Sequence, residues 1–104
     1  MYILTVSYPK SPDATFDYDY FRDKHLPQVG NVFRPFGLGY AAVLRGEQSL
    51  DGQDPAFFAT AIFSFPTEQG ARDAVASEGT ATLIADIANF TTVTPLMQYN
   101  TSVE

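Results

Sequence analysis

Histidine occurs once in the chain, at position 25, and it is the side chain best suited to proton transfer. An imidazole with an ordinary pKa of about 6.5 can gain or lose a proton near neutral pH. On a helical wheel His25 shares an arc with apolar residues, which places it on the inward stripe of a helix. It is therefore either a buried structural histidine bonded to a carbonyl or a tyrosine, or an acid–base group that faces a cavity.

Asp86 is the carboxylate that could act through His25. A carboxylate that accepts a hydrogen bond from one ring nitrogen orients an imidazole and raises its basicity. The alternative for Asp86 is an ordinary solvated helix residue. Phenols at the rim of a cavity could orient a carbonyl or enolate oxygen, although most buried tyrosines belong simply to the core. Four tyrosines are candidates for this role: Tyr8, Tyr20, Tyr40 and Tyr99.

Composition excludes several kinds of site. The chain has no cysteine, so it can form no disulfide, no thiolate nucleophile and no cysteine-ligated metal site. One histidine is too few for the usual zinc sites, and we expect no metal. Twelve acidic residues against six basic ones give a formal charge of -6, which opposes binding to nucleic acid.

Length and hydropathy patterning limit the architecture. The 104 residues suffice for one domain, which we expect to span 1–104. The most apolar stretch, near 56–65, is far shorter than the roughly 20 residues that cross a bilayer. Residues 1–6 resemble a strand rather than a signal peptide. We therefore expect no membrane partner and a cytoplasmic protein.

The elements that must position these side chains follow from periodicity and from turn residues. A first helix is expected to be capped by Asp13 or Thr15 and to run to about Val32, with a kink or an early break at Pro27. Gly79 is expected to end a later helix. The full pattern predicts strands at 2–8, 37–45, 56–65 and 92–102, and helices at 13–32, 67–77 and 81–87.

This order, β-α-β-β-α-β, predicts an α+β fold: a ferredoxin-like sheet with its helices on one face. Few polar residues occur at 56–65, so we expect Phe, Ile, Met and Tyr side chains to line the open face as well. A homodimer whose two sheets close into a barrel would cover that face and leave a dry chamber before His25. The alternative is a monomer with a half-polar open face.

Two motifs resemble those of the EthD family, and with the strand order between them they cover nearly the whole chain. The segment 85–91 and the Thr94-Pro95 that follows are similar to the tail motif of that family. The signature helix is matched by the pattern Phe16-x₃-Tyr20-Phe21-x₃-His25-Leu26-Pro27.

The resemblance implies a dimeric α+β barrel related to muconolactone isomerases, polyketide cyclases and antibiotic-biosynthesis monooxygenases. Such proteins mostly hold a small hydrophobic or aromatic molecule and work without a metal or an organic cofactor. His25 occupies the position of the motif histidine, and Asn89 and Phe90 occupy positions beside the pocket. The residues expected to contact a bound molecule are Tyr8, Tyr20, Phe21, Tyr40, Asn89, Phe90 and Tyr99.

Three functions are compatible with this sequence. In the first, the protein is a cofactor-independent isomerase, lyase, cyclase or oxygenase-type enzyme in which His25 is the acid or base and Asp86 supports it. In the second, it is a non-catalytic accessory protein that binds a metabolite of an oxidative degradation pathway. In the third, it binds haem, with His25 as the axial ligand.

Overall fold

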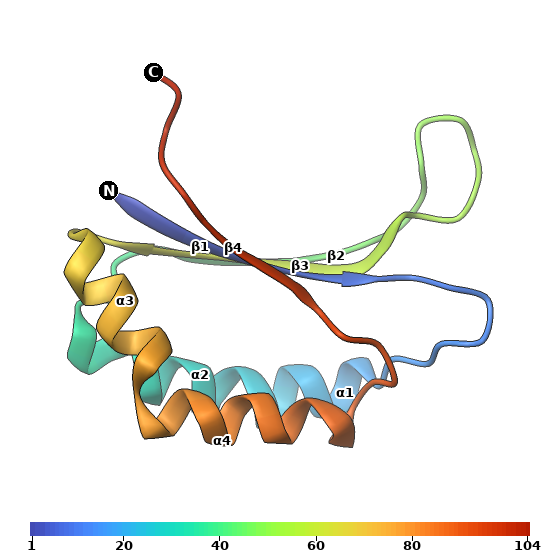
Figure 1. Cartoon of the computed structure of the whole chain (residues 1–104). Coiled ribbons are helices and arrows are strands. Elements are labelled where there is room, and N and C mark those ends of the chain that lie inside the picture. The colour runs from blue at the N-terminus through green and yellow to red at the C-terminus, as the bar shows by residue number, and fades with distance from the viewer.

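A four-stranded antiparallel sheet runs through the centre of the protein, in a computed structural model that describes residues 1–104 (Figure 1). The strand order is β2-β3-β1-β4, so β1 lies in the middle of the sheet between β3 and β4, as in a ferredoxin-like sheet. The predicted fold class is confirmed. The four strands are β1 (Tyr2–Pro9), β2 (Ala41–Arg45), β3 (Phe57–Phe65) and β4 (Leu96–Asn100).

All helices lie on one face of this sheet, and the hydrophobic core fills the space between the two layers (Figure 1). None of the helices is long and apolar enough to cross a membrane. The α-helices are α1 (Tyr18–Tyr20), α2 (Leu26–Phe33), α3 (Glu68–Ala76) and α4 (Glu78–Asp86). Shorter turns accompany them: a π-helical turn at Phe21–His25 and 3₁₀ turns at Arg34–Phe36 and Ile87–Asn89.

The first helical segment begins later than predicted and does not end at Pro27. Asp17, and neither Asp13 nor Thr15, caps it by accepting a hydrogen bond from the Tyr20 N–H. The expected break is absent because a π-helical turn comes just before the proline. In this turn the Leu26 N–H donates to the Phe21 carbonyl, five residues earlier, and the wider turn leaves room for the proline ring. Such turns are frequent at functional sites.

Gly79 does not end a helix, contrary to the prediction. Ser77 ends α3 and caps α4 by accepting a hydrogen bond from the Thr80 N–H, so the helix boundary falls two residues earlier. Gly79 lies inside α4, where an added Cβ would stand 2.9 Å from both methyl groups of Val32. The glycine is therefore required for the close approach of α4 to α2.

Two predicted strands are shorter in the structure. Gly37 adopts a left-handed conformation (φ 95°) that ends the 3₁₀ turn before it, so β2 begins only at Ala41. At the other end, β4 begins at Leu96, directly after Pro95, which has no N–H to donate to a neighbouring strand. Tyr40 is thereby left just outside β2, at the edge of the sheet.

A β-bulge changes the expected alternation at the start of β3. Tyr8 pairs with Ala59 and Pro9 pairs with Phe57, so Phe58 is the extra residue. Phe58 turns inward and stacks on Phe16, with ring centroids 5.3 Å apart, and Phe57 remains 37% exposed. Strict alternation along the strand predicted at 56–65 would place Phe57, and not Phe58, on the face of Ala59; this is wrong because the bulge resets the alternation.

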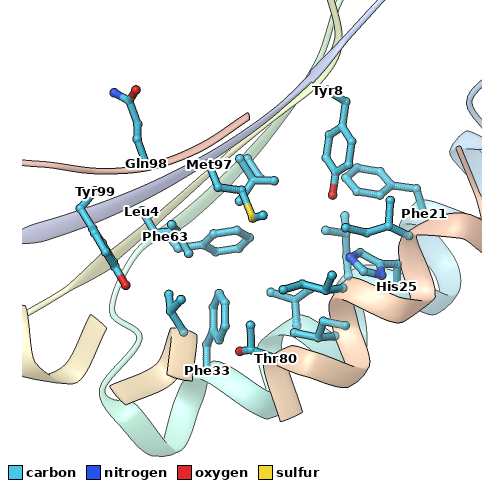
Figure 2. Close-up of a pocket in the computed structure, with 18 residues that line it drawn as sticks. Leu4, Tyr8, Phe21, His25, Phe33, Phe63, Thr80, Met97, Gln98 and Tyr99 are labelled. Atoms are coloured by element: carbon cyan, nitrogen blue, oxygen red, sulfur yellow. The ribbon is translucent and has the colours of Figure 1, made fainter. Parts of the chain in front are cut away.

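The sheet face without helices is half polar, which also differs from the prediction. Met97 and Tyr99 on β4 point toward the helices (Figure 2), and Phe57, which pairs with Pro9, is the one phenylalanine at a paired position of the open face. The prediction failed because it did not assign the aromatic and Met side chains to the correct side of each strand. Alternation and register assign these residues to the open face: Ile3, Thr5, Ser7, Pro9, Ala42, Leu44, Phe57, Thr60, Ile62, Ser64, Leu96, Gln98 and Asn100.

Candidate functional site

A cavity of about 220 Å³ lies between the sheet and the helices, inside a single chain (Figure 2). Fifteen of its 18 lining residues are hydrophobic. β1 and β4 supply the wall on the sheet side through Leu4, Val6 and Met97, while α4 supplies Leu83 and Ile84. The apolar cavity therefore lies between the sheet and the helices of a single chain, and not between two sheets as we expected from the sequence.

His25 reaches this cavity from the π-helical turn. The residue is only 4% exposed, and its Nδ1 lies 2.9 Å from Oδ2 of Asp86, at the end of α4. Its other ring nitrogen, Nε2, has no hydrogen-bond partner in the protein, and the ring lines the cavity. An Nδ1–H that donates to a carboxylate leaves the lone pair of Nε2 available to accept a proton from a bound molecule.

Asp86 is held in place by two further donors. Its Oδ1 accepts hydrogen bonds from Oη of Tyr20 at 2.6 Å and from Nδ2 of Asn89 at 2.9 Å. Burial by itself would raise the pKa of Asp86, but the hydrogen bonds from Tyr20, Asn89 and His25 outweigh it and the pKa lies below its ordinary value. The same bond to Asp86 raises the pKa of Tyr20. The carboxylate beside His25 is thus ionised at neutral pH.

Two phenylalanine rings fix the plane of the imidazole. The ring centroid of Phe90 is 4.6 Å from that of His25, and the ring of Phe21 stacks on it at 5.9 Å. Phe21 also lines the cavity, whereas Phe90 supports the imidazole from outside the lining. Packing on these rings restricts rotation of the imidazole, so the Nδ1 hydrogen bond and the cavity-facing nitrogen are kept together.

Tyr8 contributes a phenol to the same cavity. The side chain is 3% exposed and its hydroxyl points into the cavity in Figure 2. Every fully enclosed side-chain polar atom in the protein has a hydrogen-bond partner; the Tyr8 hydroxyl has none, so it is open to the cavity. Burial raises the pKa of Tyr8 well above its ordinary value of 10.0, which keeps the phenol protonated as a donor.

The structure separates the remaining predicted contact residues. Tyr99 lines the far end of the cavity. Tyr20 and Asn89 lie outside the lining and act on Asp86 instead. Tyr40 is 61% exposed and lies away from the cavity, because it precedes β2, which begins at Ala41.

Several wall residues were not singled out from the sequence. Leu26, Val29, Leu83 and Met97 line the cavity, and their helical or alternating spacing indicated only that they are buried. No sequence signal distinguishes a cavity wall from a packed core, since both need apolar side chains.

This fold and site define a small ferredoxin-like α+β protein with an internal apolar cavity and one histidine on its wall. Comparison with known proteins assigns its family. An EthD-like protein from Ralstonia eutropha superposes with a TM-score of 0.86 at 30% identity, over 99% of this chain and 92% of that one. The chain belongs to the EthD family.

A further relative is 33% identical over 93 residues, covering 86% of this chain and 84% of its own length. It is an uncharacterized 11.0 kDa protein from the thcB-thcC intergenic region of Rhodococcus erythropolis. No family model matches the sequence.

More distant structures share the fold alone. An ethyl tert-butyl ether D (EthD) family protein from Bacillus halodurans matches at 16% identity with a TM-score of 0.70, covering 97% of this chain and 99% of that one. SnoaB, a cofactor-independent oxygenase from Streptomyces nogalater, matches at 13% identity with a TM-score of 0.61, covering 99% of this chain and 91% of that one.

Proposed function

We propose that this protein binds a small hydrophobic or aromatic molecule in the cavity and that His25 acts on it as a general acid or base without a cofactor. One observation carries the proposal: Nδ1 of His25 is bonded to a carboxylate that is 11% exposed, while Nε2 faces an apolar cavity with no protein partner. A structural histidine would be expected to use both nitrogens within the protein.

In the proposed mechanism, Nε2 of His25 removes a proton from the bound molecule and later returns it at the same or another atom. Asp86 does not take this proton; its charge stabilises the imidazolium and holds the ring in the useful tautomer. His25 is only 4% exposed at the end of an apolar cavity, so a bound molecule would leave little water around it and strengthen the interaction of the imidazolium with Asp86. Isomerases, cyclases and cofactor-independent oxygenases can all begin with this step, since each can proceed through a carbanion or an enolate.

The test is a turnover screen of carbonyl and phenolic compounds, followed by comparison of variants. Replacing His25 with Ala should lower turnover by roughly 10²–10⁴-fold, the usual contribution of a general acid or base. The matched control is Lys24→Ala, an exposed neighbour outside the cavity lining, which should retain full activity. Unchanged turnover in a folded His25→Ala variant would remove the residue from the mechanism.

A non-catalytic accessory protein is the second candidate. The nearly uninterrupted apolar lining favours it, because binding by shape alone needs no proton donor. In that case His25→Asn would retain ligand binding, and no bound compound would be converted by the unmodified protein.

Haem binding does not fit the cavity. The volume of about 220 Å³ is below even the range of roughly 300–1,000 Å³ that holds drug-sized ligands. The lining also contains no Lys or Arg to pair with the two haem propionates. No mechanistic step is therefore assigned to an iron centre on His25.

We also propose that two chains associate through the sheet face that carries no helices. Ile3, Leu44, Ile62 and Leu96 supply apolar surface there, and Leu44 and Leu96 are 55% and 61% exposed. Figure 1 shows the β2–β3 loop and the C-terminal segment both extending beyond this face, where they would reach a second copy. Sedimentation should give the mass of a dimer; a monomer at every concentration up to the millimolar range would refute this.

A further inference from the structure

The cavity lining carries no formal charge that a ligand could meet. Among its 18 residues there is no Lys, Arg, Asp or Glu. A protonated His25 would already be paired with Asp86, at 2.9 Å. A carboxylate or phosphate drawn into this cavity would lose its hydration without gaining an ionic partner, which is strongly unfavourable. The cavity therefore suits an uncharged molecule.

The polar atoms that remain available to a ligand are few. The Thr80 hydroxyl is used within the protein, because it donates to the Ala74 carbonyl at 2.6 Å. The side chain of Gln98 points away from the cavity in Figure 2 and donates to Asn100. The phenols of Tyr8 and Tyr99 and Nε2 of His25 are left.

Tyr8 and His25 lie at the same end of the cavity, whereas Tyr99 lies at the other end (Figure 2). The rings of Tyr8 and His25 both pack on Phe21, at 5.6 and 5.9 Å, and both pack on Phe90, at 5.7 and 4.6 Å. One end of the cavity thus presents a permanent donor, the Tyr8 hydroxyl, beside an acceptor, Nε2 of His25.

We propose that the ligand is an uncharged phenol or enol of one or two rings, with its hydroxyl group bound between Tyr8 and His25. A hydroxyl is the group that can accept a hydrogen bond from Tyr8 and donate one to Nε2 at the same time. The size follows from the cavity of about 220 Å³, which exceeds the roughly 150 Å³ of an apolar cavity that accommodates benzene.

This inference rests on the proposed function and specifies the proton that His25 would move. The O–H bond of the ligand breaks, the proton passes to Nε2, and the electron pair stays on the oxygen and is shared with the ring or double bond. Tyr8 then donates to an oxygen that carries more negative charge than before, so its hydrogen bond strengthens as the proton leaves.

The test compares three probes by calorimetric titration at neutral pH: 2-naphthol, naphthalene and 2-naphthoate. The unmodified protein should bind 2-naphthol at least threefold more tightly than naphthalene and should not bind 2-naphthoate. Tyr8→Phe keeps the ring and removes the donor, so it should abolish most of the preference for 2-naphthol while leaving naphthalene binding unchanged. Tyr40→Phe, the matched control, removes a phenol from a residue that is 61% exposed and lies outside the cavity lining, so it should leave both affinities unchanged.

The outcomes separate this inference from the proposed function. If naphthalene binds but 2-naphthol binds no more tightly, or if 2-naphthoate binds as well as 2-naphthol, the phenol inference is wrong and the apolar cavity remains a binding site. If none of the probes binds, the proposed cavity function is refuted along with the inference. Unchanged naphthalene binding by the Tyr8→Phe variant shows that the variant is folded.

Discussion

Replacing Ala61 with Val should stabilise the protein, because the added carbons would enter the cavity. Ala61 lies on β3, is 3% exposed, and belongs to the cavity lining. Valine adds two carbons, each worth about 0.8 kcal/mol when buried, and it suits a strand. Some of this gain is lost in fixing the side chain, so we expect about 1 kcal/mol, or a rise in Tm of roughly 4–8 °C for a domain of this size.

The matched control is Ala74→Val. Ala74 is 0% exposed and lies outside the cavity lining, so the same two carbons must be forced into a packed region. Overpacking of this kind costs roughly 1–3 kcal/mol. Urea denaturation with unchanged m-values would measure both changes. A loss of stability in Ala61→Val as large as that in Ala74→Val would show that the cavity wall cannot accept added volume.

Three other perturbations test the site and the packing around it. Asp86→Asn should lower any turnover by roughly 10²–10⁴-fold with little effect on ligand affinity, because an amide no longer fixes the tautomer of His25; equal turnover would contradict the assigned role. The lowered pKa of Asp86 predicts that its contribution to stability is present above the unfolded value of about 3.9 and is lost as the pH falls through the lower folded value. Denaturation curves from pH 6 to pH 2 should show a larger loss of stability in the unmodified protein than in Asp86→Asn, which keeps only the loss from groups such as Asp23. Gly79→Ala should destabilise the protein, despite the better helix propensity of alanine, because its Cβ would crowd Val32; a higher Tm would refute the close-packing argument.

Most of the fold could be predicted from the sequence because its main signals are local. Alternating apolar residues indicate β1 and β3, and prolines and glycines mark the ends of elements. The errors occurred where the outcome depends on contacts between distant segments. The bulge that turns Phe58 inward depends on pairing with Pro9, and the role of Gly79 depends on Val32 of another helix.

The candidate site was predicted in part for similar reasons. His25 stood out because it is the single histidine, and Asp86 because a carboxylate can serve an imidazole; the structure places the two in contact. Tyr40 was a poor candidate because its exposure is determined by where β2 begins. The cavity itself could not be predicted, since its walls have the same composition as a filled core.

The walls of the cavity differ in how firmly they are held. β1 is hydrogen-bonded to a strand on each side, whereas β4, which carries Met97 and Tyr99, is bonded to β1 alone. Opening an outermost strand breaks one ladder of hydrogen bonds, so it costs less than opening any inner one. Met97 on β4 and Ile84 on α4, both in the cavity lining, are each 49% exposed, so the cavity opens to solvent between these two elements. A guest molecule would therefore enter and leave past β4, and loosening of this strand would widen the entrance.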